Sequence, residues 1–358
     1  MNSRERVLKA LGRKGKPDRT PMEISFGVFT PDLMERYKRE TLSNLEPFEY
    51  FDFDTRPVFL KPTQKKIDFQ KYFPNKLPDN TVMDEWGYGG TPGSVRHFLE
   101  YKYHPLAECT TPEEVYAFDW NDIDADYRYE GLEEQVKGYQ ERGYAVMGEM
   151  YQTIYEITWL LRGMERTMMD FYENPEIIHV MCDKITEMRI KQAQNFALMG
   201  VDILRLGDDV TCQNGLIMSL DTYREFFKER TRKIIQAAKK IKPTILVFMH
   251  SDGKIDKLVP ELIDIGVDIL NPVQPECNDL EKIACDFDDK ISFWGGIGTQ
   301  SVMPFGTPNE VRAKVKETWR ILGRKGGLLL APTHILEPEV PWENILAFIE
   351  ATKECRYE

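Results

Sequence analysis

The strongest constraint on the fold is a repeat of apolar, strand-like runs that alternate with amphipathic helical stretches. Eight such runs lie near residues 20, 52, 145, 202, 244, 268, 291 and 327, and six of them alternate cleanly with helical patterns. Buried parallel strands separated by helices are the repeat of a (β/α)8 TIM barrel in the α/β class. A doubly wound sheet is the alternative, but the glycine-rich first turn typical of that fold is missing. The sequence therefore favours the barrel.

One stretch departs from this repeat. Between residues 63 and 107, TVMDEWGYGG and SVRHFLEYKYHP alternate around a Gly/Pro turn, which predicts a β-hairpin. We interpret 63–107 as an N-terminal hairpin insertion laid over the barrel. The whole chain, 1–358, is then one barrel domain.

Composition excludes several classes of protein. Hydrophobic residues make up 42%, enough for a full core, and no apolar run approaches the ~18–20 residues of a membrane helix. The net charge of −12 argues against a nucleic-acid partner, because phosphates require a basic face. Six scattered cysteines and a charged N-terminal stretch without a signal peptide indicate a cytoplasmic protein without membrane association.

Polar and ionisable residues gather where the predicted strands end, which is where a barrel binds its ligands. They are Glu23 (first strand), Glu149 and Tyr151 (third), Asp208 and Asp209 (fourth), His250 and Asp252 (fifth), Asn271 and Gln274 (sixth), Trp294 to Gln300 (seventh) and His334 (eighth). Of the five histidines, only His250 and His334 lie at strand ends. Such a ring of Asp, Glu and His suits a metal site or an acid–base apparatus.

Each of these residues also has a structural interpretation. A lone histidine is commonly a core or surface residue, and GDDVTCQNG after the fourth strand fits an Asx turn that caps a helix. Glu23 and Glu149 could face solvent. Glu149 and Tyr151 are two residues apart, however, so they share one face of an extended strand, and burial there would raise a carboxylate pKa.

Several long motifs resemble the uroporphyrinogen decarboxylase superfamily. They are SRERVLKALGRKGKPDRTPM, GDDVTCQNGLIMSLDTYREFFKERTRKI, WGGIGTQSVMPFGTP and GGLLLAPTHILEPEVPWENILAFIEA. The resemblance spans nearly the whole chain and implies a (β/α)8 fold. Decarboxylases of this superfamily carry an arginine-rich segment after the first strand that holds porphyrinogen carboxylates. Here that position reads SFGVFTPDLM, without an arginine between residues 20 and 35, which weakens a decarboxylase assignment.

The second branch of the superfamily contains corrinoid-linked methyltransferases, several of which bind zinc through a His-x-Cys pair and a later Cys. In this chain those positions fall at His250, Asp252 and near His334. A His/His/carboxylate set is harder than a thiolate set, and it suits an oxygen donor such as the ether oxygen of a methoxy compound. The resemblance therefore implies demethylation of a methoxylated or N-methylated small molecule.

We predict zinc ligands at His250, His334 and Asp252, catalytic carboxylates at Asp208, Glu149 and Glu23, and substrate contacts from Tyr151, Trp86, Gln213 and Gln300. The resemblance implies that the methyl acceptor is the cobalt of a corrinoid. Since the chain contains no DxHxxG segment of the kind found in cobalamin-binding domains, we expect a separate protein to carry that corrinoid. A homodimer is compatible with these predictions. A decarboxylase acting on a porphyrinogen or another acid is the alternative, followed by a barrel that only binds a ligand.

Overall fold

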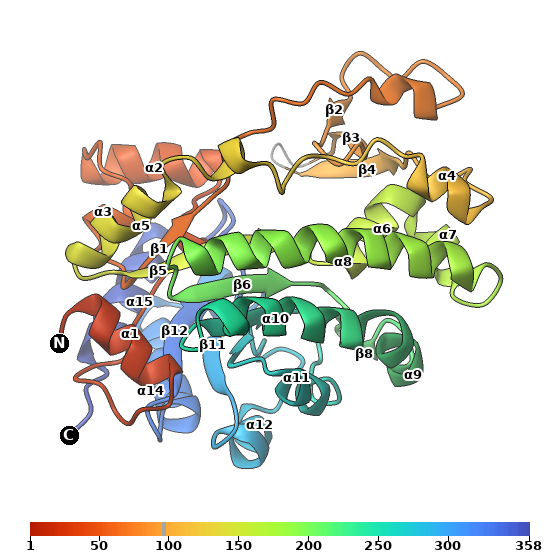
Figure 1. Ribbon diagram of the computed structural model, residues 1–358. Helices are drawn as coiled ribbons and strands as arrows, with labels where there is room; N and C mark the ends of the chain where they lie inside the picture. The colour runs from red at the N-terminus through yellow and green to blue at the C-terminus, as the bar shows by residue number, and fades with distance from the viewer. Residues whose placement is uncertain (95–97) are drawn as a thin grey trace.

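Seven parallel strands form the centre of the molecule (Figure 1). The computed structural model describes residues 1–94 and 98–358. The strands neighbour one another in the order β1 (Thr55–Val58), β5 (Ala145–Tyr151), β6 (Ile203–Gly207), β9 (Leu246–His250), β10 (Ile269–Asn271), β11 (Ser292–Ile297) and β12 (Leu328–Pro332). These are seven of the eight strands that the sequence predicts.

The eighth predicted strand, near residue 20, closes the ring between β12 and β1. Met22 forms a parallel bridge with Leu330, whose N–H also donates to the carbonyl oxygen of Pro21 at 2.9 Å. On the other side, the N–H of Asp54 donates to the carbonyl oxygen of Met22 at 3.1 Å. The segment is short and irregular, but it occupies the place of the first barrel strand, and the (β/α)8 prediction is confirmed.

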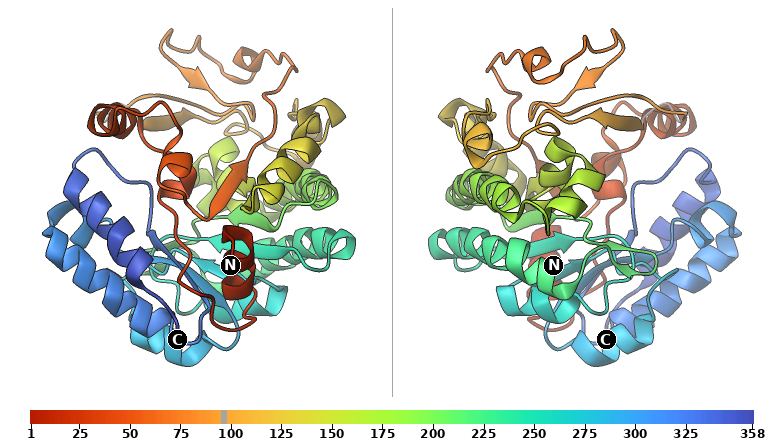
Figure 2. Two further views of the ribbon diagram at one scale, coloured as in Figure 1. Left: turned by 90° about the vertical axis from the view of Figure 1, so that its left-hand side faces the viewer. Right: turned by 90° about the vertical axis from the view of Figure 1, so that its right-hand side faces the viewer.

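Helices surround this ring of strands, as the two side views in Figure 2 show. The longer ones are α1 (Ser3–Leu11), α2 (Pro31–Thr41), α5 (Leu132–Glu141), α6 (Tyr155–Arg162), α7 (Met164–Asp170), α8 (Pro175–Leu198), α10 (Glu229–Ile241), α11 (Val259–Ile265), α12 (Leu280–Phe287), α14 (Pro308–Leu322) and α15 (Trp342–Glu354). Short turns of helix are α3 (Pro47–Tyr50), α4 (Pro112–Tyr116), α9 (Leu220–Tyr223), α13 (Val302–Phe305) and the segments 25–27, 126–129 and 224–228. A capping box begins α14, since the Thr307 side chain accepts from the N–H of Glu310 and the Glu310 side chain accepts from the N–H of Thr307.

Alternation along each strand divides the core in two. One cluster lies inside the ring and includes Met147, Phe248 and Trp294, together with Val7 and Leu11 from α1. A larger cluster joins the outer faces of the strands to the helices. Each large apolar side chain buried in this way contributes about 1.5–3 kcal/mol. The same alternation directs Glu149, two residues beyond Met147, toward the inside of the ring.

The insertion lies at the top of Figure 1 and forms a separate antiparallel sheet. Its strands are β2 (Val82–Met83), β3 (Gly89–Pro92) and β4 (Leu99–Tyr103), and a 3-10 turn at Phe69–Tyr72 precedes them. The pair β3–β4 is the predicted hairpin, although its tip at 95–97 lies outside the described residues. That residues 1–358 constitute one domain stays a prediction.

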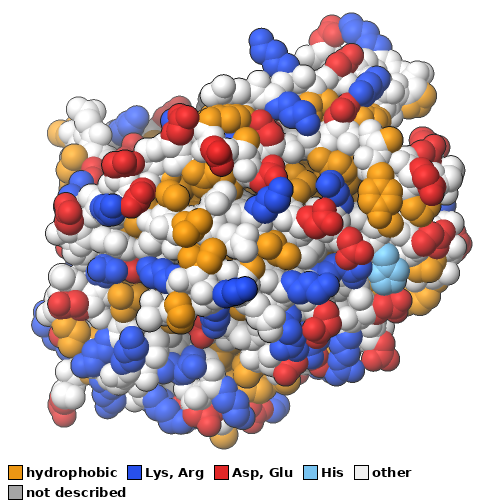
Figure 3. Space-filling view, viewed as in Figure 1, with side chains coloured by type: hydrophobic (Ala, Val, Ile, Leu, Met, Phe, Trp, Pro, Cys, Tyr) orange, Lys and Arg blue, Asp and Glu red, His pale blue; other side chains and the backbone are white. Residues whose placement is uncertain are grey.

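Acidic and basic side chains are interspersed over the face drawn in Figure 3. In the described ranges, no helix combines the length and the apolar character needed to cross a bilayer. All six cysteines are described, and none is in a disulfide. A two-stranded ribbon, β7 (Thr211–Cys212) and β8 (Gly215–Leu216), extends from the end of β6.

Candidate metal centre and adjoining cavities

Two histidines and a carboxylate meet at the carboxyl ends of β9 and β12. The ligand atoms of His250, Asp252 and His334 all lie within 4.8 Å of one another. Asp252 stands between the rings, with its carboxylate 3.7 Å from His250 Nε2 and 3.9 Å from His334 Nε2. Burial raises the pKa of Asp252 and lowers that of His334, and their mutual attraction opposes both shifts. The three residues predicted as metal ligands are therefore brought together.

The orientation of His250 is fixed from behind by Asn271, the last residue of β10. Asn271 Nδ2 donates to the carbonyl oxygen of Trp294 at 2.9 Å, which leaves its Oδ1 to accept from His250 Nδ1 at 2.5 Å. Nδ1 must then carry the proton, so the lone pair is on Nε2, the atom that faces Asp252. This is the tautomer that a metal ligand requires.

The spacing of these atoms can be compared with that of a bound ion. Two ligand atoms held by one tetrahedral zinc at ~2.1 Å each lie about 3.4 Å apart. The observed separations of 3.7 and 3.9 Å exceed this by a few tenths of an ångström, which small side-chain rotations supply. Three ligands of N, N, O type also leave one position open, as catalytic zinc requires. The residues present therefore fit a zinc ion.

A cavity of about 350 Å³ opens beside the two histidines. It is lined by Phe26, Val28, Phe59, Glu149, Tyr151, Gln152, Glu156, Arg205, Gly207, Asp209, His250, His334 and Ile335. Arg205 Nη1 donates to Glu149 Oε2 at 2.6 Å, and the guanidinium carbon lies 3.7 Å from the centre of the Phe26 ring. Burial raises the pKa of Glu149, although the Arg205 charge opposes this shift.

Glu23 lies inside the barrel rather than on the cavity wall. Its Oε1 accepts from Trp294 Nε1 at 2.9 Å, and its Oε2 is buried without a hydrogen-bond partner. Burial raises the pKa of Glu23 to about 7, against the hydrogen bond from Trp294 and the charge of Arg205. The predicted catalytic role of Glu23 is untested, but the structure separates it from the cavity surface.

Asp208 and Asp209 have different positions. The Asp208 carboxylate accepts from the N–H groups of Ile154 and Glu156, which begin α6, at 2.9 and 3.0 Å. It caps this preceding helix, and burial raises its pKa to about 6. Asp209 lines the cavity, with Oδ1 3.7 Å from His250 Nε2. Asp208 is one of the three carboxylates predicted to be catalytic, and that role stays a prediction, whereas Asp209 is the neighbour that faces the histidines.

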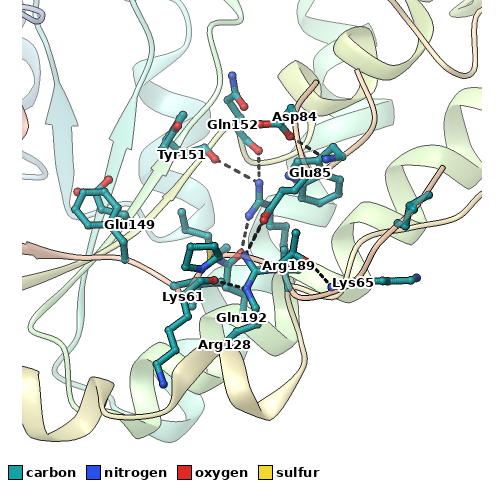
Figure 4. Close-up of a pocket in the computed structure, with 18 of the residues that line it drawn as sticks. Lys61, Lys65, Asp84, Glu85, Arg128, Glu149, Tyr151, Gln152, Arg189 and Gln192 are labelled. Carbon is teal, nitrogen blue, oxygen red and sulfur yellow. Dashed lines mark hydrogen bonds and ion pairs between the residues drawn. The ribbon is translucent and has the colours of Figure 1, made fainter. Parts of the chain in front are cut away.

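A second, larger cavity of about 790 Å³ lies between the barrel and the insertion (Figure 4). Its walls come from residues 59–69 and 83–86, from the end of β5 and from α8. Phe59, Glu149, Tyr151 and Gln152 line both cavities, so the two adjoin at the end of β5. A third cavity, of about 440 Å³, shares His334 with the first and also includes Asp252, Gln300, Glu337 and Glu339.

The predicted substrate contacts are distributed among these spaces. Tyr151 lines the first two cavities, and Trp86 lines the larger one, 5% exposed, beneath the insertion. Gln213 and Gln300 lie at the rim, where Gln213 Nε2 donates to Gln300 Oε1 at 2.9 Å and links the loops after β6 and β11. These two side chains bind each other, and their contact with a substrate stays a prediction.

The sequence analysis gave no role to Arg205, Asn271 or Glu156. The buried position of Arg205 could have been predicted, because it is the charged residue at the centre of the run ILRLG. A charge buried inside the barrel requires a partner of opposite charge. Asn271 was recognised as a strand-end residue, but its contact with His250 depends on the register of β9 and β10. Glu156 lies within a helical pattern, where the sequence gives no indication that it faces the site.

Known proteins resemble this chain in sequence. The uroporphyrinogen decarboxylase (URO-D) family model matches residues 157–355. The methylcobamide:CoM methyltransferase MtaA of Methanosarcina barkeri is 25% identical over 48% of this chain and 47% of that protein. The methylated-thiol–coenzyme M methyltransferase of Methanosarcina mazei is 28% identical over 54% and 49%, and the uroporphyrinogen decarboxylase of a Hydrogenobaculum species is 22% identical over 55% and 54%. The chain spans about half the length of the curated relatives it matches.

The fold is also found among solved structures. A methyltransferase from Methanosarcina mazei superposes with a TM-score of 0.69 at 18% identity and covers 99% of each chain. At this identity the likeness supports the fold, and it agrees with the ring of strands described above. Since the family model matches more than half of the residues, the chain belongs to the uroporphyrinogen decarboxylase family.

Proposed function

We propose that this protein is a methyltransferase. It removes a methyl group from a methoxylated or N-methylated small molecule and transfers it to the cobalt of a separate corrinoid protein. The observation that carries this proposal is the cluster of His250, Asp252 and His334 beside a cavity at the carboxyl ends of the strands. Relatives named as methylcobamide and methylated-thiol methyltransferases support it.

The cluster would hold zinc through His250 Nε2, His334 Nε2 and an Asp252 oxygen. When bound, the ion supplies a Lewis acid that draws electron density from the donor heteroatom. Asn271 holds the His250 ring in place, so that the donor meets a preformed site. The cavity of about 350 Å³ has room for one small donor and excludes most water from around it.

Methyl transfer breaks the bond between the methyl carbon and its oxygen or nitrogen, and the heteroatom keeps the electron pair and takes up a proton. Glu156 is placed to supply that proton to an oxygen donor. It lines the cavity, and burial together with the nearby Asp209 raises its pKa well above the ordinary value. Glu149, held by its ion pair with Arg205, orients the donor.

A decarboxylase is the second candidate, since several relatives carry the name uroporphyrinogen decarboxylase. A porphyrinogen brings many carboxylates, each of which costs several kcal/mol to bury without a cation. The cavity beside the histidines presents Glu149, Glu156 and Asp209 against one arginine that is already paired. We therefore expect no conversion of uroporphyrinogen III to coproporphyrinogen.

The test measures zinc content and methyl transfer together. The protein is purified with zinc present, and methylcobamide formation is followed by absorbance with a corrinoid protein and a panel of methoxylated and N-methylated donors. We expect close to one zinc per chain, with His250→Ala and His334→Ala losing both zinc and activity. His179→Ala, which changes a histidine on α8 away from the site, is the matched control and should retain both.

Three outcomes would contradict the proposal. They are wild-type protein that binds no zinc after metal-replete purification, a His250→Ala/His334→Ala variant that keeps stoichiometric zinc, and coproporphyrinogen as the product. Cytoplasmic location and a homodimeric assembly belong to the same proposal, and fractionation of the source cells and light scattering would test them.

A further inference from the structure

The cavity beneath the insertion has a charge opposite to that of the whole molecule. Five cationic side chains line it, Lys61, Lys65, Lys66, Arg128 and Arg189, against the acidic Asp84, Glu85 and Glu149. The chain as a whole has 47 basic and 59 acidic residues. The three lysines are exposed at the opening of the cavity, and the two arginines are buried in its walls. Because the walls have a low dielectric constant, these charges give the cavity a positive potential that attracts anions.

Several of these charges already have partners. Arg128 makes an ion pair with Glu85 at 2.9 Å and another with Asp122 at 3.1 Å. Glu149 is paired with Arg205 from inside the barrel. Glu85 and Glu149 thus make their ion pairs with cations other than Arg189. Burial raises the pKa of Asp84, and the nearby charge of Arg189 opposes this shift.

Among the described residues that line this cavity, Arg189 is the buried cation that makes no ion pair. In the described part of the chain no carboxylate lies within ion-pair distance of its guanidinium. The group donates to the carbonyl oxygens of Gln152 and Thr153, at 2.7 and 3.2 Å, and to Gln192 Oε1 at 2.6 Å. Burial lowers the pKa of Arg189 to about 10. A buried cation without a counter-ion is costly, and an anion in the cavity would relieve that cost.

The wall that joins the two cavities carries two aromatic side chains, Phe59 and Tyr151, together with the polar Glu149 and Gln152. Trp86 lies over the Arg189 guanidinium at 5.0 Å from the ring centre, and Phe59 and Tyr151 continue into the smaller cavity. Figure 4 shows Arg189 between Gln152 and Tyr151 on one side and Gln192 on the other. A volume of about 790 Å³ lies within the ~300–1,000 Å³ of small-molecule sites.

We propose that this cavity binds the anionic end of the methyl donor, which is a methylated organic acid. Its charged group lies near Arg189 and Arg128, its flat apolar body lies along Trp86 and Phe59, and its methyl-bearing atom reaches toward the histidines past Tyr151. This inference rests on the proposed methyl transfer for the identity of the ligand. The anion site itself depends only on the cavity, and it can be tested without metal, corrinoid or turnover.

The experiment compares two probes that differ in charge. Dissociation constants of 3-methoxybenzoate and the uncharged 3-methoxybenzamide are measured by calorimetry on the metal-free full chain. We expect the carboxylate to bind about tenfold more tightly than the amide, since charge-assisted hydrogen bonds to arginine are the stronger kind. Arg189→Gln should reduce this ratio to near one, and Trp86→Leu should weaken both probes equally.

A second variant tests the proposal even if Arg189→Gln fails to fold. The exposed lysines at the opening, changed together as Lys65→Gln/Lys66→Gln, should weaken binding of the carboxylate about threefold and leave the amide unchanged. The matched control is Lys233→Gln/Lys240→Gln on α10, which removes the same charge from exposed positions away from the cavity. This control should alter neither constant.

Equal affinities for the two probes in wild type would overturn the proposal, as would an unchanged ratio in both cavity variants. The outcomes also separate it from the proposed function. Charge-selective binding without methyl transfer from any donor would refute the methyltransferase and keep the anion site. Methyl transfer from neutral donors alone, without charge-selective binding, would support the methyltransferase and refute the anion site.

Discussion

The two cavities that adjoin at the end of β5 come from different parts of the chain and have opposite electrical character. The smaller one is built from strand ends of the barrel and holds histidines and carboxylates. The larger one is roofed by the insertion and is lined by more cations than anions. The barrel fixes side chains at set positions around a ring, whereas a loop excursion can vary without disturbing the ring. The comparison suggests that chemistry and recognition are divided between them.

The largest expected effect concerns the wall between the cavities, where Arg205 pairs with Glu149. Arg205→Met leaves a buried carboxylate without its cation, so we expect about 3–5 kcal/mol loss in the free energy of unfolding. Urea denaturation measures this loss. In the double variant Arg205→Met/Glu149→Leu much of it should be recovered. A single variant within about 1 kcal/mol of wild type would show that the pair is not needed to separate the two environments.

The second prediction concerns Glu23, which lies inside the barrel and so belongs to neither cavity. Its pKa in the folded state, about 7, exceeds the ordinary 4.5, so folding favours the protonated carboxyl. The stabilisation is complete below about pH 4.5 and disappears as the pH rises through 7. Between pH 5 and 8, wild type should lose up to about 3 kcal/mol relative to Glu23→Gln, because one pKa unit corresponds to about 1.4 kcal/mol. Parallel unfolding curves in the two proteins would contradict this.

The third prediction concerns the histidine side, through Asn271. Asn271→Leu removes the acceptor for His250 Nδ1–H, and we expect a 10–100-fold weaker zinc affinity, about the effect of losing such a partner elsewhere. Asn271→Asp keeps an acceptor oxygen at the same place and should retain more of the affinity. Competition with a chromogenic chelator measures both. Equal affinities in the two variants would mean that the ring is held by its surroundings alone.

The smallest effect is expected at the rim, where Gln213 and Gln300 bind each other. Gln300→Ala removes one exposed hydrogen bond and should change stability by less than about 0.5 kcal/mol. If the donor binds in the two cavities, KM should change less than threefold. A large rise in KM with normal stability would instead place the substrate at the rim and remove the division between the cavities.

The strands of the barrel could be predicted from the sequence because each of the predicted runs is apolar and bounded by turns. The helices α2, α3 and α5 were not predicted, although α2 and α3 lie between the first strand segment and β1, where the alternation requires helices. In α2, Leu33 and Tyr37 are buried four residues apart, a helical spacing hidden among charged neighbours. The local hydrophobic pattern therefore predicted the strands of the barrel better than it predicted the helices between the first strand and β5.

The metal cluster was predictable because strand ends of one barrel must converge, so His250 and His334 could be placed together despite their separation in sequence. Which of two adjacent aspartates faces them was not predictable. Asp208 and Asp209 are adjacent, but their side chains have different partners. The N–H groups at the start of α6 donate to Asp208, and Asp209 lies beside His250. Which aspartate faces the histidines depends on how β6 and α6 pack against each other, and the residues around Asp208 do not determine that packing on their own.

The closure of the ring by Met22 and Leu330 has a consequence for synthesis of the chain. The partner of the first strand lies more than 300 residues downstream, so the ring stays open until Leu330 has left the ribosome. Before that, the Pro21–Met22 segment lacks its partner β12, and α1 lacks its packing against β11 and β12, so apolar surface is exposed. Contacts of such long range slow folding, and exposed strand edges invite aggregation. The nascent chain therefore has to remain soluble as an open, unfinished ring for most of its translation.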